Sequence, residues 1–255
     1  MLAVMSHKNL LLFTVFLAGL IPVLSSHAAN HPASGDVFAK TNLVAWCIVP
    51  FDINHRGPVE RAEMLNRLGI TKLAYDWREQ HIPTFDREID AVRDHEIVLQ
   101  AFWLTSGTNP EREKNVELVL DLLRRRNVKT QLWYLFIPPR GFDSFSQEQK
   151  IEAAGNAVRY IAGKAAQTGS SVGLYNHGGW FGEPENQLAI LDYLHLPNVG
   201  MVYNFNHAEQ QIESFPGFFP KIEPHLIALN LAGLDKTHRK VVAIGEGDSE
   251  LEMIR

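Results

Sequence analysis

Residues 174–186 read LYNHGGWFGEPEN, and this stretch decides how the rest of the chain is interpreted. An apolar run ends in Asn176 and His177, turns through two glycines, presents Trp180 and enters a Pro-Glu-Asn sequence typical of a helix start. A strand that leads through a turn into a helix is part of a β-α-β unit. The polar residues at its end, with Glu183 just beyond them, are either the rim of a ligand site or only a polar loop.

The same pattern of strand and then helix recurs along the chain. Apolar runs of strand type begin near residues 43, 71, 97, 129, 171, 199 and 227, mostly about 28 residues apart. Helical periodicity lies between several of them, at 59–68, 116–123 and 151–165. Units of this length imply parallel strands joined by helices. Seven such units without a GxGxxG turn predict an α/β protein, a (β/α)8 TIM barrel rather than an open dinucleotide-binding sheet.

Residue alternation within two of these strands also fits a barrel wall. Ala228 and Asn230 fall on one face of IALNLAG, and Val202, Asn204 and Asn206 fall on one face of MVYNFNH. Small or polar residues toward the axis and bulky ones toward the helices are typical of barrel strands.

The end of the chain predicts an incomplete barrel. In GEGDSELEMIR, Ser249 and Glu252 form a capping-box pattern, and the sequence stops one turn later, before an eighth strand. The barrel domain, residues 42–255, is therefore expected to be truncated before its last strand. Two alternatives are a partner that covers the gap and a short last strand formed by VVAI at 241–244.

The beginning of the chain has the pattern of a secretory signal peptide. An apolar run, NLLLFTVFLAGLIPVL, is followed by SSHAA, which predicts a signal peptide over 1–28 and a polar linker over 29–41. The run is short for a membrane span, which needs about 20 residues, although an uncleaved anchor is the alternative. We expect an exported protein, periplasmic or secreted, with no membrane association after cleavage. Cys47 is the single cysteine, so no internal disulfide forms, and its apolar surroundings predict a small buried side chain.

Composition and charge restrict the partners. The net charge is −5, and the densest basic run, Arg124–Arg126, falls at a predicted helix end, so we expect no nucleic-acid partner. No P-loop, HExxH or GxSxG motif is present. Strand ends without paired carboxylates also weigh against a glycosidase. Oligomerisation is left open.

His177 and His207 are the leading catalytic candidates, because both follow neighbouring strands at the barrel end where active sites lie. Two imidazoles at that end can act as acid and base or share a metal; a structural hydrogen-bonding role is the alternative. Glu183 is the third catalytic candidate, unless it only begins a helix. Tryptophan faces and neutral amides suit a sugar, which makes a small carbohydrate the expected substrate. The expected substrate-binding residues are Asn176, Trp180, Asn204, Asn206, Asn230, Asp76, Trp103 and Glu246. Asp76 can instead pair with Arg78, and Trp46 and Trp133 can simply fill the barrel.

Four features of the second half of the chain fit one known pattern: YNHGG at 175–179, NFNH at 204–207, Asn230 and the GEGD loop at 245–248. With them, the sequence from about Asn42 to Arg255 resembles the xylose isomerase-like TIM-barrel superfamily, including its exported bacterial sugar isomerase/epimerase-like members, most strongly from Gly173 onward. Members of that superfamily often have Glu-Asn-His-Gly-Gly at strand five, Asp-x-x-His at strand six, a His at strand seven and a Gly-x-Gly loop before the last helix. In that superfamily Glu, Asp, His and a last-strand Glu hold a divalent metal that polarises a sugar carbonyl. Here the corresponding residues are Tyr175, Asn204 and Asn230, so the carboxylates are replaced. The resemblance implies that His177 and His207 are the remaining residues to hold a metal (Mn, Co, Zn or Mg).

The function expected from this resemblance is that of a sugar isomerase or epimerase, which moves a proton beside a carbonyl. Asn176, Asn204, Asn206 and Asn230 would hold hydroxyl groups, and Trp180 would stack on the sugar. One alternative is a lyase or hydratase acting on 3-keto-glycosides, because the same proton loss drives that reaction. The other is a catalytically degenerate barrel that binds carbohydrate without turnover.

Overall fold

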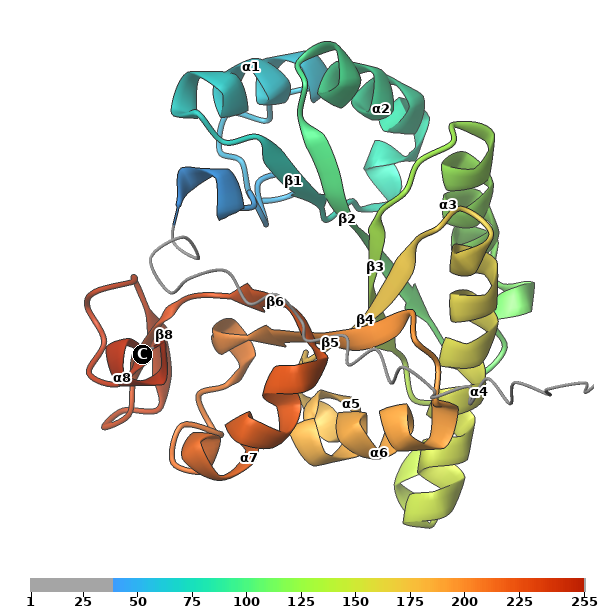
Figure 1. Cartoon of the computed structure of the whole chain (residues 1–255), viewed down its shortest axis with the longest axis vertical. Coiled ribbons are helices and arrows are strands. Elements are labelled where there is room, and N and C mark those ends of the chain that lie inside the picture. The colour runs from blue at the N-terminus through green and yellow to red at the C-terminus, as the bar shows by residue number, and fades with distance from the viewer. Residues whose placement is uncertain (1–38, 255) are drawn as a thin grey trace, which may run out of the picture. The chain divides into compact units, whose positions relative to one another are not determined.

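The computed structural model describes residues 39–254, which lie within one compact unit. Its centre is a parallel sheet with the strand order β1-β2-β3-β4-β5-β6, in which each strand pairs with the next along the chain (Figure 1). The strands are β1 (Lys72–Tyr75), β2 (Val98–Ser106), β3 (Gln131–Phe136), β4 (Ser171–Tyr175), β5 (Val199–Asn204) and β6 (Leu226–Asn230). The predicted signal peptide and most of the predicted linker lie outside the described residues. Within the described part, no helix is long and apolar enough to cross a membrane.

Six of the seven predicted strands are confirmed, each starting within two residues of its predicted position. The first, near residue 43, is wrong as a full strand: it contributes one parallel bridge, between Ala45 and Leu73. The physical reason lies two residues later, where Cys47 has a φ of 60° and turns the chain out of the extended conformation. The segment is therefore held at the β1 edge by Ala45 alone, yet it still places Trp46 against the sheet.

The helices surround the sheet on its outer side (Figure 1). The α-helices are α1 (Pro58–Leu68), α2 (Phe85–Asp94), α3 (Lys114–Arg125), α4 (Gln147–Ala166), α5 (Gly179–Gly182), α6 (Pro184–Leu194), α7 (Phe215–Ile222) and α8 (Glu250–Ile254). Short 3-10 helices are η1 (Lys40–Asn42), η2 (Glu79–Thr84), η3 (Pro110–Arg112), η4 (Phe142–Ser144), η5 (Phe205–His207) and η6 (Glu223–His225). The three predicted helices correspond to α1, α3 and α4.

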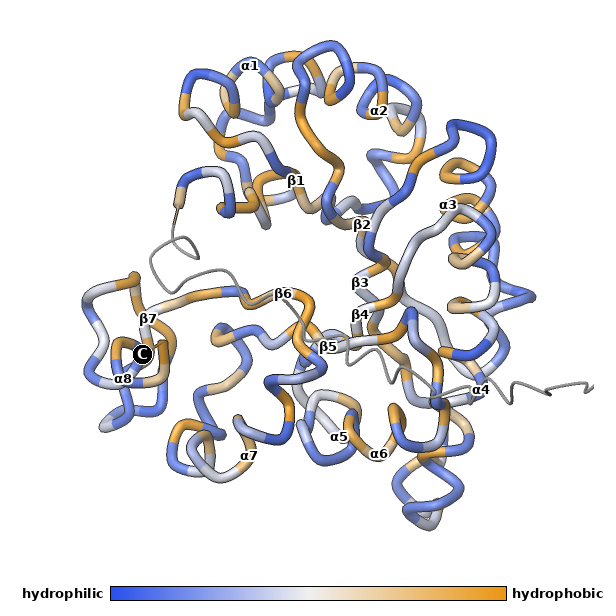
Figure 2. The backbone as a smooth tube through the Cα atoms, in the orientation of Figure 1, coloured by the Kyte–Doolittle hydropathy of each residue, from blue (hydrophilic) through white to orange (hydrophobic). Residues whose placement is uncertain are grey.

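Helix ends follow local sequence signals. In α4 the Ser146 hydroxyl accepts from the Gln149 amide while the Gln149 side chain accepts from the Ser146 amide, which satisfies two N–H groups that have no partner within the helix. Figure 2 shows helix turns alternating between hydrophilic and hydrophobic residues, as expected for helices with one face on a core.

The sheet separates two apolar regions. Leu, Ile and Phe side chains between strands and helices form the larger core, which includes Leu73, Tyr75 and Phe102. A smaller interior cluster on the opposite face contains Ala74, Ala101, Trp133, Tyr175 and Val202. Because successive strand residues point to opposite faces, small residues of several strands line the interior, and β2, β3 and β4 add the large rings of Trp103, Trp133 and Tyr175.

The last part of the chain forms a separate hairpin. β7 (Gly233–Asp235) and β8 (Lys240–Val242) pair antiparallel in their own two-stranded sheet. The alternative that VVAI serves as the last barrel strand is therefore wrong, and β6 is the outermost strand of the main sheet among the described residues. α8 confirms the predicted helix, but the Ser249 hydroxyl donates to Asp248 instead of capping it.

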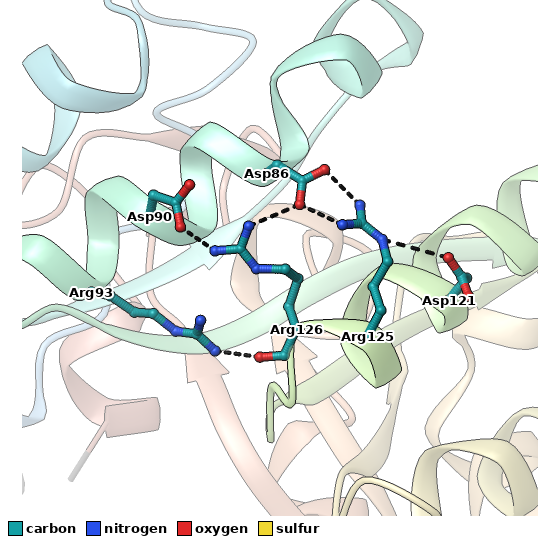
Figure 3. Close-up of polar contacts among 6 residues, drawn as sticks. All are labelled: Asp86, Asp90, Arg93, Asp121, Arg125 and Arg126. Carbon is teal, nitrogen blue, oxygen red and sulfur yellow. Dashed lines mark hydrogen bonds and ion pairs between the residues drawn. The ribbon is translucent and has the colours of Figure 1, made fainter.

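An ion-pair network joins α2 to the end of α3 on the outer surface (Figure 3). Arg125 donates to both carboxylate oxygens of Asp86, each at 2.6 Å. Arg126 contacts Asp86 and Asp90, and its carbonyl accepts from Arg93. Two members of the basic triplet are thus paired with acidic residues of a neighbouring helix. This pairing supports the structural interpretation of these arginines.

Candidate functional site

His177 and His207 meet at the carboxyl end of the sheet, as their positions after β4 and β5 predicted. Their ring centroids are 4.1 Å apart. His177 is exposed, and His207, in η5, is half-buried. Gly178 and Gly179 follow with φ values of 74° and 61°, so the turn that presents His177 uses two consecutive left-handed residues. This geometry explains the HGG sequence and brings two titratable rings from separate strands into contact.

His207 is biased toward its neutral form. Burial lowers the pKa of His207, and the neighbouring His177 lowers it further because two charged imidazoles repel each other. The carboxylate of Glu209 acts in the opposite direction and raises that pKa. One oxygen of Glu209 is buried and has no hydrogen-bond partner among the residues that the structure describes. Glu209 was not among the predicted site residues, although its position two residues after His207 was a signal that could have identified it.

Tyr175 lies directly beneath the imidazole pair. Its ring centroid is 6.2 Å from that of His177 and 6.3 Å from that of His207. Its hydroxyl oxygen accepts N–H groups from Trp46 at 3.3 Å, from Asn230 at 3.1 Å and from Asn204. Sequence reasoning treated Tyr175 only as a lost metal ligand. The alternation Gly173, Tyr175, His177 was the available signal that Tyr175 faces the site.

An aromatic layer surrounds Tyr175 on the interior face of the sheet. Trp103 packs against Tyr175 at 5.0 Å and against His177 at 6.1 Å between ring centroids. Trp46 packs on Trp133 at 4.9 Å, and Trp133 stacks on Tyr175 at 6.0 Å. Trp133 is fully buried, in agreement with its interpretation as barrel filling. Trp103 is half-buried next to His177, so it is the tryptophan that the structure brings to the pair.

The four predicted asparagines have different roles in the structure. The Asn176 amide, 1% exposed, accepts from the Asn204 backbone N–H at 2.6 Å and donates to the Asn204 carbonyl at 3.2 Å. These bonds join the ends of β4 and β5, which makes Asn176 a positioning residue. Asn204 and Asn230 both reach Tyr175. Asn206 is exposed in η5, and its backbone N–H donates to the Asn204 side chain at 2.9 Å.

Trp180 and Glu183 lie in the α5–α6 region, and their described contacts are not with the histidine pair. The Trp180 indole N–H donates to Gln147 at 2.9 Å, and its ring packs on Phe142. Glu183 accepts from Gln211 at 3.1 Å and occupies the residue before α6, as its helix-start interpretation predicted. No described contact therefore supports the prediction that Trp180 and Glu183 belong to the site of the histidine pair.

Glu246 lies in the turn after β8 and is exposed. The Gly-x-Gly loop around it instead wraps Glu250, whose carboxylate accepts the backbone N–H groups of Gly245, Gly247 and Leu234. The loop therefore holds α8 to the hairpin, and no described contact links Glu246 to the histidine pair.

Asp76 is a buried carboxyl that faces the interior of the sheet. Ala74 belongs to the interior cluster, whereas Tyr75 and Trp77 pack on Phe85 on the helix side, so alternation places Asp76 inside. Asp76 is 1% exposed, and in the described part of the chain neither carboxylate oxygen has a hydrogen-bond partner of good geometry. Burial raises the pKa of Asp76 to about 7, although nearby backbone amides and Arg78 oppose that rise.

Cys47 adjoins Asp76. Burial, followed by the Asp76 charge, raises the pKa of the Cys47 thiol to about 12, so the sulfur is an unreactive thiol at neutral pH. The alternative of an Asp76–Arg78 salt bridge is not observed: Arg78 instead donates to the Asp76 and Trp77 carbonyls.

The side chains at this end of the sheet do not fit a divalent metal. Around the Tyr175 oxygen, three N–H groups present hydrogens where a cation needs lone pairs. Across residues 39–254, no group of three or more His, Cys, Asp or Glu side chains could hold a metal ion. The histidine pair alone supplies two of the four ligands of a typical zinc site.

Comparison with known proteins finds similar structures but no similar sequences. No protein-family model matches the chain, and no curated protein matches its sequence. Among solved structures, the probable 3-DHS dehydratase AsbF of Bacillus anthracis, involved in petrobactin synthesis, matches with a TM-score of 0.62 and 16% identity over 83% of this chain and 86% of that one. The 3-keto-D-glucoside 4-epimerase YcjR of E. coli matches with a TM-score of 0.59 and 14% identity over 84% and 85%.

The chain has the xylose isomerase-like TIM-barrel fold. Its six described parallel strands form part of the barrel that the repeat pattern predicted. The IolI protein, solved with a bound zinc atom, matches with a TM-score of 0.57 and 14% identity over 75% of each chain. At such identities the likeness establishes the fold, and the site chemistry has to be argued from this chain's own residues.

Proposed function

We propose that the protein transfers a proton beside the carbonyl of a small carbohydrate, as a sugar isomerase or epimerase does. The observation that carries this proposal is the contact between His177 and His207, two titratable rings from different strands, 4.1 Å apart. Proton abstraction next to a carbonyl needs a base in its neutral form and an acid near it. Packed imidazoles supply both, since protonation of one ring disfavours protonation of the other.

The pair suggests a division of roles. His207, with its lowered pKa, is neutral at pH 7 and accepts the proton from the carbon. His177, exposed at the turn, returns a proton to the neighbouring carbon or to the opposite face of the same carbon. The first outcome is isomerisation and the second is epimerisation. In both, the product has the same overall oxidation state as the substrate. Trp103 lies beside His177 and offers a ring face to the C–H side of a sugar.

The names of two structurally similar proteins support the general type of reaction but not a particular substrate. One similar structure is a 3-keto-D-glucoside 4-epimerase, a name that describes chemistry at the carbon next to a keto group, and another is a probable 3-DHS dehydratase. A lyase acting on 3-keto-glycosides begins with the same proton loss. It is therefore the second candidate and differs in what leaves the neighbouring carbon.

A third candidate is a barrel that binds carbohydrate without turnover. The neutral side chains Tyr175, Asn204 and Asn230 favour it, because they hold no charge that would stabilise a reaction intermediate by Coulomb interaction. The proposed reaction uses no divalent metal, because the groups around the Tyr175 oxygen present N–H hydrogens instead of lone pairs. Export from the cell remains a proposal that rests on the sequence of residues 1–28.

Solvent exchange tests the proposed reaction. The purified protein is incubated in D2O with D-fructose, D-tagatose and a 3-keto-glucoside, and deuterium at sugar carbons is measured by NMR. We expect exchange in the wild type and its loss in His177→Ala and His207→Ala. His225→Ala is the matched control, since His225 is exposed in η6 away from the pair. Exchange that survives in both site variants would remove the histidines from the mechanism, and elimination products would favour the lyase.

A further inference from the structure

Three N–H groups from distant parts of the chain converge on one oxygen atom. Trp46 comes from the bridge segment, Asn204 from the end of β5 and Asn230 from the end of β6, and all three donate to the Tyr175 hydroxyl. Tyr175 itself is 2% exposed, whereas Trp46 and Asn230 are half-buried. The oxygen therefore lies near the edge of the buried region, where a ligand can approach it past Asn230.

The directions of these donors follow from their other bonds. An indole nitrogen can only donate. The Asn204 side-chain oxygen is occupied by the Asn206 backbone N–H at 2.9 Å, so its NH2 group must face Tyr175. Asn204 in turn is held through its backbone by Asn176. Within residues 39–254, the Asn230 amide makes no second hydrogen bond that fixes it, so among these three donors Asn230 is the one that can turn to accept.

This arrangement changes the character of the phenol. Burial raises the pKa of Tyr175, so the hydroxyl carries its hydrogen at neutral pH. Two fixed donors cannot accept that hydrogen, which leaves it for Asn230 or for a bound ligand. N–H groups donated to the oxygen withdraw electron density from the O–H bond, and they are already aimed at the oxygen on which negative charge would develop.

We propose that the Tyr175 hydroxyl is the electrophile of this site, donating its hydrogen to a substrate oxygen at the point where the strand-end side chains converge. The inference rests on the proposed function, because it supplies the group that polarises the carbonyl. It assigns to a hydrogen bond the role that a divalent cation would otherwise fill.

The step balances without a further reactant. His207 takes the proton from the carbon next to the carbonyl, and that electron pair forms a carbon–carbon double bond. The carbonyl oxygen gains the displaced pair and accepts a hydrogen bond from the Tyr175 hydroxyl, which keeps its hydrogen while the N–H groups of Trp46 and Asn204 stay directed at its oxygen. When His177 protonates the carbon, the double bond returns to the carbonyl, and the proton held by His207 passes through water to restore His177.

A test that does not require turnover uses a sugar hydroxamate, threonohydroxamate, as a mimic of the enediolate. Its binding is measured by calorimetry with and without EDTA, in the wild type, Tyr175→Phe and Trp46→Phe. We expect wild-type binding that EDTA does not change. In Tyr175→Phe we expect a loss of about tenfold to a hundredfold, as for a hydrogen bond to a charged group. In Trp46→Phe, which removes one of the three donors, we expect a smaller loss.

Tyr134→Phe is the matched control: Tyr134 is fully buried in β3, and its hydroxyl bonds to Ser106 at 2.7 Å. A loss in Tyr175→Phe is counted only if thermal unfolding shows that the variant is folded. If Tyr175→Phe does not fold, Trp46→Phe decides the question by the same measurement.

The outcomes separate this inference from the proposed function. Binding abolished by EDTA, binding unchanged in Tyr175→Phe, or no binding by the wild type would each overturn the role of Tyr175. A mimic that binds through Tyr175 while no sugar exchanges deuterium would keep the inference and overturn the proposed reaction.

Discussion

Two polar groups, Tyr175 at the end of β4 and Asp76 just after β1, are both buried but are stabilised in different ways. At the end of β4, the Tyr175 oxygen is surrounded by three donors and carries no charge. At the end of β1, Asp76 is as deeply buried, but neither of its oxygens has a well-aligned hydrogen-bond partner among residues 39–254. Burial raises the pKa of Asp76 to about 7, so below that pH a proton offsets the cost of burying this carboxyl. The comparison teaches that one buried polar group is stabilised by hydrogen-bond donors and the other by protonation.

The largest effect that would sharpen this contrast comes from Asp76→Asn. The folded protein holds the Asp76 proton up to about pH 7, whereas an unfolded chain releases it near its ordinary value. Because the folded pKa of this acid is raised, its contribution to stability is largest at low pH and is lost as pH rises toward 7. The stability of Asp76→Asn relative to the wild type should therefore increase between pH 4 and pH 8, by up to about 4 kcal/mol.

Urea unfolding across that pH range measures the difference. Asp143→Asn, at an exposed aspartate in η4, is the control and should show no such trend. Parallel pH profiles for Asp76→Asn and the wild type would mean that Asp76 is ionised in the fold and would break the comparison.

The next effect concerns the neutral side of the contrast. Tyr175→Phe removes the acceptor and leaves the N–H groups of Trp46, Asn204 and Asn230 without it, at an expected cost of about 1–3 kcal/mol. Tyr134→Phe removes a hydroxyl with a single side-chain partner, so its cost should be smaller. Chemical denaturation of both variants gives the ranking, and equal costs would argue that the three donors do not act on Tyr175.

A smaller effect is expected at the imidazole pair. Since His177 lowers the pKa of His207, His177→Gln should raise that pKa toward its ordinary value. Because its pKa is lowered, His207 stays neutral to a lower pH than an ordinary histidine does. Exchange activity of the wild type should persist to that lower pH as well. NMR titration of the imidazole C–H signals tests this, with His225→Gln as control. An unchanged titration of His207 would mean that the two rings are not coupled.

The smallest effect lies outside the sheet altogether, in the network of Figure 3. Arg125 and Asp86 are both partly exposed, with side chains at 43% and 45%. Solvent screening should make the cost of Arg125→Ala the smallest of those considered, despite good geometry. Thermal unfolding at low and high salt measures it, and a large loss would show that charge pairs contribute more to this fold than buried polar groups do.

Much of the architecture could be predicted from periodicity, because strands and helices here follow their local patterns closely. The segment near residue 43 could not, since a single left-handed residue, Cys47, overrides an apolar run with high strand propensity. The place of VVAI was also hidden, because a short strand carries no signal of whether its partner is parallel or antiparallel.

At the site, strand ends identified His177, His207 and the asparagines, since parallel strands bring their carboxyl ends together. Trp180 and Glu183 follow β4 in sequence, yet α5 turns them toward α4 and Gln211, a change of direction that spacing does not encode. The role of Tyr175 could not be predicted, because in the family pattern its position belongs to a metal ligand and the pattern gives no role to a tyrosine there. Its convergent partners, Trp46 and Asn230, lie 129 and 55 residues away along the chain.

That separation has a consequence for how the molecule assembles. The bond between Trp46 and Tyr175 closes a loop of 129 residues, so we expect it to form after the intervening strands and helices have found their order. The difference in indole fluorescence between the wild type and Trp46→Phe should then change in the last kinetic phase of refolding, after far-UV circular dichroism has reached its native value. The polar centre of the barrel would thus be completed late, when the segment before β1 reaches the end of β4.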